Sequence, residues 1–152
     1  MKRGGSMDMV IDHIGIVVRR LEEGLEQWTS LFGYTPLTEQ ITNTRQKVRV
    51  IFLHKRNSCL IKLVEPTDDQ SPVYKFALKG GGLHHICFRC DDVSAGVERF
   101  REKGYHILSE PLPGEAFGNE KIAFFYARQG LNIELIDTEK KSGRRDLQEG
   151  RP

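Results

Sequence analysis

The chain repeats itself with a nearly constant spacing of 72 residues. Four of the aligned pairs are His13 with His85, Gly24 with Gly96, Phe52 with Phe124, and Lys62 with Glu134. The spacing falls to 71 at Gly33 and Gly104 and then returns to 72. An offset that loses one residue and regains it is expected for two copies of one folding unit that differ by single insertions or deletions. The repeat therefore favours a fold built from two equivalent halves.

Each copy has the hydrophobic pattern of one strand, one helix and three further strands. In the first copy, residues 10–18 are rich in Val and Ile, and Leu21, Leu25 and Trp28 follow at helical spacing up to Gly33. The remaining strands of this copy are expected at 34–40, 48–54 and 59–65. In the second copy we expect strands at 83–89, 105–108, 121–126 and 131–136, and a helix that begins at Asp91 or Asp92 and ends at Lys103.

These elements predict an α+β protein made of two βαβββ modules, at residues 9–66 and 83–138. Residues 67–82 should link the modules and contain a short helix over 73–78, with Ser71 as its cap and Pro72 at its first position. A unit of about 55–60 residues buries little surface by itself, so the modules should share a core and enclose a common concavity. The charged segment 139–152 is expected to be a disordered tail.

Charge and composition exclude several classes of partner. The net charge is +2, but residues 1–8 and 139–152 hold seven of the 23 basic and four of the 21 acidic residues, which leaves 16 basic and 17 acidic residues elsewhere. We therefore expect no nucleic-acid-binding surface. No apolar run reaches the ~18 residues of a membrane span, so we expect no membrane partner. The three cysteines suit a reducing compartment, and we expect a cytoplasmic protein.

Four polar side chains occupy equivalent positions in the two copies and should converge in the concavity. His13 matches His85 and Lys62 matches Glu134, so a pseudo-two-fold axis would bring all four together. Two imidazoles and a carboxylate from separate strands form a suitable ligand set for a divalent metal. The alternative is that each histidine is a hydrogen-bonded core residue, and the sequence leaves both interpretations open. His84 should point away from His85 and have a structural role, because neighbouring side chains of a strand alternate.

The repeat and its motifs resemble the vicinal oxygen chelate superfamily, which includes glyoxalase I, extradiol dioxygenases, and the bleomycin and fosfomycin resistance proteins. The stretches that carry the resemblance are Asp12-His13-Ile14-Gly15-Ile16-Val17-Val18, Ser71-Pro72 with Phe76, Gly82-Leu83-His84-His85-Ile86, Asp91-Asp92-Val93, and Ile133-Glu134-Leu135. The helix that starts at Ser71-Pro72 and the His84-His85 pair are most similar to the methylmalonyl-CoA epimerase branch. The resemblance implies a paired, curved mixed sheet and a homodimer.

The resemblance also implies metal ligands at His13, His85 and Glu134, with Glu134 as the candidate catalytic residue. The implied ion is divalent: Co, Zn, Ni, Mn or Mg. Two positions depart from the epimerase pattern. Lys62 stands where a fourth ligand, Glu or Gln, is implied, and Arg45 stands where a glutamate base is implied. Arg45 cannot accept the proton that epimerisation beside a thioester removes, because an arginine stays protonated.

Lys62 bears directly on metal binding. An ammonium group ~4 Å from a divalent ion would be repelled by about 8 kcal/mol at an effective dielectric of about 20. Either Lys62 is neutral, or its side chain turns away, or no metal binds and the ammonium pairs with Glu134 in the metal's place. We therefore expect metal binding to be weakened or lost.

Two functions from different classes remain open. The first is a metal-dependent isomerase or lyase that acts on a small acidic or acyl-CoA-like substrate, with slow or absent methylmalonyl-CoA epimerisation. The second is a non-catalytic, resistance-type protein that sequesters an anionic small molecule between Arg45, Lys62 and Arg89. Arg89 enters this set because strand alternation places it on the same face as His85.

Overall fold

A computed structural model of the chain describes residues 8–145. The strands are β1 (Val10–Val17), β2 (Thr35–Pro36), β3 (Ile41–Asn43), β4 (Val48–His54), β5 (Leu60–Pro66), β6 (Gly82–Arg89), β7 (His106–Pro113), β8 (Lys121–Ala127) and β9 (Leu131–Ile136). The helices are α1 (Leu21–Phe32), α2 (Tyr74–Leu78) and α3 (Val93–Glu102), with 3₁₀ turns η1 (Glu115–Phe117) and η2 (Arg128–Gly130). This order is that of two βαβββ modules joined by α2, with one extra short strand in the first.

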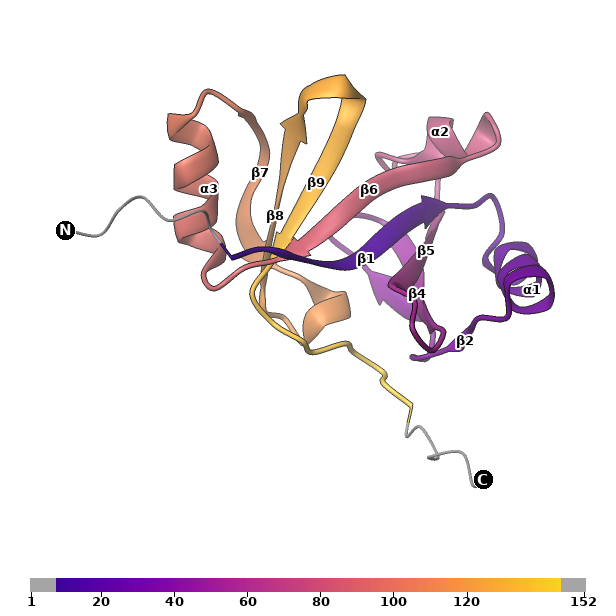
Figure 1. The fold of residues 1–152 in the computed structure, drawn as a ribbon. Helices are drawn as coiled ribbons and strands as arrows, with labels where there is room; N and C mark the ends of the chain where they lie inside the picture. Colours follow the sequence, from indigo (N-terminus) through magenta and orange to yellow (C-terminus); the bar gives the residue numbers. More distant parts are fainter. Residues whose placement is uncertain (1–7, 146–152) are drawn as a thin grey trace.

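The strands of this part of the chain form one curved mixed sheet. Their order is β2-β4-β5-β1-β6-β9-β8-β7, and β3 pairs with β4. Within each module the first strand runs parallel to the last, β1 beside β5 and β6 beside β9, and the modules meet through antiparallel β1 and β6. In Figure 1, β1 and β6 cross the middle of the molecule, while α1 and α3 lie at opposite ends. The structure therefore confirms the α+β architecture expected from the repeat.

The two faces of the sheet bury different sets of side chains. On one face, α1 packs against a cluster that includes Ile61 and Leu63, and α3 packs against one that includes Phe125 and Leu135. The other face, shared by both modules, holds a third cluster that contains Phe52 and Phe117, both buried. This shared face is the concavity into which the paired polar side chains point.

Two β-bulges interrupt the pairing of β1 with β6. His13 lies opposite Cys87 and Ile11 opposite Phe88, so Asp12 is an extra residue on β1. Gly15 lies opposite His85 and Ile16 opposite Leu83, which makes His84 the extra residue on β6. A bulge re-aims the side chain of the inserted residue. Asp12 and His84 are 72 residues apart, so the repeat extends to its irregularities.

The linker helix and the edge strands differ from the expected boundaries. Helix α2 begins two residues later than Pro72, with Val73 as its cap. Strand β7 continues past the expected end at Leu108 and includes two prolines. An edge strand tolerates proline because one row of its N–H groups has no partner in the sheet.

The prediction of a disordered tail over residues 139–152 was wrong for its first part, residues 139–145. Residues 139–145 pack against both modules, and the side chain of Lys141 is buried. Residues 146–152, the rest of the expected tail, lie outside the described residues. No helix within 8–145 is long and apolar enough to cross a membrane.

Candidate metal and ligand site

Four adjacent strands each contribute one polar side chain to the shared face. In the order of the sheet they are Lys62 on β5, His13 on β1, His85 on β6 and Glu134 on β9. All four are buried, and His13 and Glu134 are fully so. The convergence expected from the repeat is therefore what the structure shows.

The distances among these groups are those of a compact cluster. The Nε2 atom of His13 lies 3.0 Å from Oε1 of Glu134 and 3.2 Å from Nε2 of His85. The Nε2 atom of His85 lies 3.5 Å from the same carboxylate oxygen, and Nζ of Lys62 lies 3.7 Å from Oε2. Side-chain atoms of His13, His85 and Glu134 come within 4.8 Å of one another, close enough to share one metal ion.

Hydrogen bonding around His13 indicates that the cluster suits a cation. The Nδ1 atom of His13 lies 2.7 Å from Oδ2 of Asp12. An ionised carboxylate only accepts hydrogen bonds, so we assign the proton of His13 to Nδ1, and Nε2 then points a lone pair at Glu134. Both oxygens of Glu134 are buried and lack a hydrogen bond of good geometry. The Nε2 atom that carries this lone pair lies 3.0 Å from one oxygen of Glu134 and 3.2 Å from Nε2 of His85. The Lys62 ammonium, 3.7 Å from the other oxygen, supplies positive charge there, and a metal held by His13, His85 and Glu134 would supply more.

Burial and the neighbouring charges set the protonation states. Burial disfavours the charged form of Glu134, but the positive charge of the Lys62 ammonium holds the pKa of this carboxyl well below its usual range. Burial lowers the pKa of His85 to about 3, because the attraction of Glu134 offsets only part of the desolvation. At neutral pH the group therefore presents a carboxylate and a neutral His85 imidazole, the forms that bind metals.

Each histidine of the pair is oriented by the residue before it. Asp12 contacts Nδ1 of His13, and Nδ1 of His84 lies 2.8 Å from Nδ1 of His85. Both contacts depend on the bulges, which turn the two side chains toward the histidine that follows. The expectation that His84 points away from His85 was wrong for this reason.

A cavity of about 200 Å³ opens beside the cluster. Its polar lining residues are Gln46, Lys62, His84, His85, Ser109 and Asn132. The other lining residues are apolar: Val48, Val64, Pro72, Val73, Leu108 and Phe124. The cavity reaches the cluster through Lys62 and His85, with His13 and Glu134 behind them.

The structure does not bring Arg45 or Arg89 to this cavity. Arg45 is exposed in the turn before β4, and the next residue, Gln46, lines the cavity instead. Arg89 shares a strand face with His85 but lies four residues farther along β6. There its guanidinium lies 3.4 Å from Asp12 and 3.5 Å from Glu139. The anionic pocket expected between three cations therefore keeps only Lys62.

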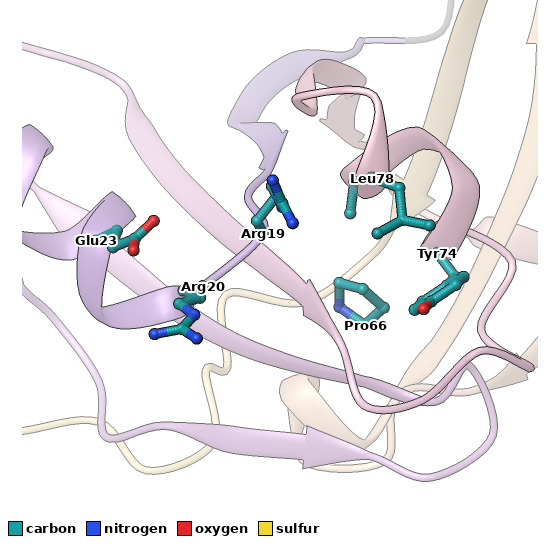
Figure 2. Close-up of a pocket in the computed structure, with 7 residues that line it drawn as sticks. Arg19, Arg20, Glu23, Pro66, Tyr74 and Leu78 are labelled. Carbon is teal, nitrogen blue, oxygen red and sulfur yellow. The ribbon is translucent and has the colours of Figure 1, made fainter.

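A larger hollow, of about 530 Å³, lies elsewhere on the surface (Figure 2). Its lining residues are Arg19, Arg20, Glu23, Pro66, Tyr74, Ala77 and Leu78. None of them belongs to the cluster, and volume alone does not make a site. The smaller cavity combines an apolar wall with a few convergent polar groups, as ligand sites do.

Comparisons with known proteins agree with this geometry. The family model of the glyoxalase/bleomycin resistance protein/dioxygenase superfamily matches residues 12–124. The chain belongs to this superfamily. The superfamily match includes most of β1 and all of β5 and β6, and therefore three of the four clustered side chains; Glu134 lies beyond its end.

Individual relatives within the superfamily are similar over most of their length. An uncharacterised Bacillus subtilis protein, YqjC, is 32% identical over 84% of this chain and 91% of its own. The ethylmalonyl-CoA/methylmalonyl-CoA epimerase of Cereibacter sphaeroides is 29% identical over 82% of this chain and 95% of its own. A Streptomyces coelicolor methylmalonyl-CoA epimerase variant, solved with 2-nitronate-propionyl-CoA, is 29% identical with a TM-score of 0.76 and covers 88% of this chain and 99% of its own.

Sequence reasoning missed several polar groups at the site: Ser109 and Asn132, which line the cavity, and also Gln46, His84 and Asp12. Gln46 gave no signal, because its place depends on the course of a turn. His84 and Asp12 were visible as neighbours of the paired histidines, but only the bulges direct them to the site. Their equivalence in the repeat was the one signal that could have suggested related roles.

Proposed function

We propose that this protein binds an anionic ligand of the acyl-CoA type, with its acyl end in the 200 Å³ cavity, beside a His13–His85–Glu134 centre whose metal affinity is lowered by Lys62. The observation that carries the proposal is the cavity itself. One end presents the Lys62 ammonium and the His85 imidazole, while much of the remaining wall is apolar. Two of the relatives named above carry acyl-CoA compounds in their names, which supports this class of ligand.

Different groups at the cavity would bind different parts of the ligand. The Lys62 ammonium would attract a carboxylate or a developing enolate oxygen, and this attraction is strong in a site with little water. Val48, Val64 and Phe124 would enclose the acyl carbons. A divalent metal on His13, His85 and Glu134 would supply Lewis-acid stabilisation of negative charge on the ligand.

Proton transfer is the step that this cavity supports poorly. Arg45 stands outside the cavity, and the neutral amide of Gln46 occupies the nearest lining position. Neither side chain accepts a proton at neutral pH, and burial lowers the pKa of His84 and of His85, which makes these lining imidazoles weak bases. We therefore expect methylmalonyl-CoA to bind and its epimerisation to be slow or absent.

The experiment combines calorimetry with proton exchange. Methylmalonyl-CoA is titrated into the protein, and exchange at its α-carbon is followed by NMR in deuterated water, both with and without Co²⁺. Binding with exchange far slower than about 1 per second supports the proposal. Turnover of 1–10³ per second, typical of enzymes in general, would show that a base acts here. Absence of binding would contradict the proposed ligand class.

A second candidate is a metal-independent binding protein, and the Lys62–Glu134 ion pair favours it. The 3.7 Å separation lets the ammonium provide the positive charge that Glu134 needs. In that case ligand affinity would be the same in a chelator as in Co²⁺. A rise in ligand affinity with Co²⁺ would favour the metal-dependent form.

A further inference from the structure

The segment 139–145 forms a strap that ties the two modules together behind the cluster. On the side of the first module, the backbone N–H of Glu39 donates to the carbonyl of Gly143 at 2.7 Å. On the side of the second, the N–H of Ser142 donates to the carbonyl of Ala116 at 2.9 Å. Both bonds are made by the two residues that follow Lys141. They therefore fix the backbone position from which its side chain extends into the protein.

Within the strap, Lys141 is the residue whose side chain reaches the groups around His13. Its side chain is 3% exposed, and Nζ lies 3.2 Å from Oδ1 of Asp12. The same ammonium lies 5.4 Å from the ring centres of both Phe52 and Phe117. The two rings also contact His13, with centroids 5.2 and 5.9 Å from its imidazole. Lys141 thus contacts three of the groups that surround His13, namely Asp12, Phe52 and Phe117.

The two carboxylate oxygens of Asp12 have different partners. Oδ2 accepts from Nδ1 of His13 at 2.7 Å, while Oδ1 receives Lys141 at 3.2 Å and Arg89 at 3.4 Å. A buried carboxylate is costly unless it is paired, and Lys141 is its buried cationic partner, because Arg89 is 33% exposed and also pairs with Glu139.

We propose that Lys141 is a positioning residue of the candidate metal centre. Its ammonium holds the Asp12 carboxylate in the orientation that keeps the proton of His13 on Nδ1 and directs Nε2 toward Glu134. The assignment of His13 as a metal ligand rests on the proposed function, whereas the orientation of its ring and its tautomer do not. Substitution of a residue that hydrogen-bonds to a metal-coordinating side chain typically lowers metal affinity 10–100-fold.

The test reads the tautomer of His13 directly in metal-free protein. With ¹⁵N-labelled histidine, long-range ¹H–¹⁵N correlations distinguish a proton on Nδ1 from one on Nε2. We expect the Nδ1–H form in the wild type, a mixture in Lys141→Met, and recovery in Lys141→Arg, which keeps the cation. Lys140→Met is the matched control, because Lys140 is exposed and pairs with Glu120 instead.

A second readout is the affinity for Co²⁺, which should fall three- to tenfold in Lys141→Met, less than for a direct partner of the ligand. Since Lys141 acts through Asp12, adding Lys141→Met to Asp12→Asn should cost no further affinity. If Lys141→Met does not fold, Lys141→Gln keeps an N–H donor without the charge and replaces it.

An unchanged His13 tautomer in a folded Lys141→Met or Lys141→Gln variant would overturn the proposal. Additive losses of Co²⁺ affinity when Lys141→Met is combined with Asp12→Asn would also overturn it. Absence of Co²⁺ binding by the wild type would contradict the metal centre alone, and the tautomer measurement would still decide the role of Lys141.

Discussion

Lys62 and Glu134 occupy equivalent positions of the two repeats, and their charged ends lie 3.7 Å apart at the junction of the modules. Both side chains are buried, with exposed fractions of 4% and 0%. The repeat thus pairs a buried cation with a buried anion at positions related by the pseudo-two-fold arrangement. Removing one member of such a pair leaves the other charge uncompensated, so the two residues must be understood together.

Gly15 is expected to be essential for the position of His85. A Cβ atom on Gly15 would lie 2.1 Å from Cε1 and 2.3 Å from Nδ1 of His85, far inside van der Waals contact with the imidazole ring. Gly15→Ala should therefore displace the ring, lower the free energy of unfolding by about 1–3 kcal/mol, and weaken Co²⁺ binding. Denaturant unfolding of the metal-free protein measures the first effect. In the background of His85→Ala the same substitution should cost much less, and an equal cost in both backgrounds would rule out this contact as the cause.

Stability should fall on acidification because His85 is buried in its neutral form. The unfolded chain binds a proton at this histidine below about pH 6.5, whereas the native pKa is about 3. The free energy of unfolding should therefore decrease as the pH falls from 6.5 toward 3, by up to about 1.4 kcal/mol per pH unit for this one proton. His85→Gln should remove that contribution in denaturant unfolding at a series of pH values. His106→Gln, at an exposed histidine, is the control, and an identical slope in wild type and His85→Gln would contradict the prediction.

Ligand binding should depend on Gln46 rather than on Arg45. Gln46 lines the cavity, and loss of one hydrogen bond from its amide should weaken methylmalonyl-CoA binding about three- to tenfold in Gln46→Ala. Arg45→Ala should stay within about twofold of the wild type, since its side chain is exposed outside the cavity. Calorimetric titration of both variants compares them. A larger loss from Arg45→Ala would mean that the turn before β4 folds over the ligand.

The sequence was sufficient to predict the convergence of His13, His85, Lys62 and Glu134. The reason is physical: side chains alternate along strands, so a repeat with a constant offset places equivalent residues on equivalent faces. It was insufficient for Asp12 and His84, because a bulge is defined by the register between two strands and not by either strand alone.

Other differences arise from contacts between distant segments. Arg89 shares a strand face with His85, as expected, but Asp12 and Glu139 bind it at the far end of β6. The segment 139–145 is highly charged and resembles a disordered tail, yet its backbone pairs with both modules and it buries Lys141. Local composition could not indicate those partners, which lie up to 129 residues away.

The charge of Lys62 is the central element of the account, and calorimetric titration of Co²⁺ into the metal-free protein tests it most directly. The wild type should bind weakly, because His13, His85 and Glu134 face a fixed ammonium. Lys62→Gln removes the charge and offers an oxygen ligand, so affinity should rise at least about tenfold, or 1.4 kcal/mol. Lys62→Met removes only the charge and should give a smaller rise, which separates repulsion from coordination. Tight Co²⁺ binding by the wild type, unchanged in Lys62→Gln, would contradict the account.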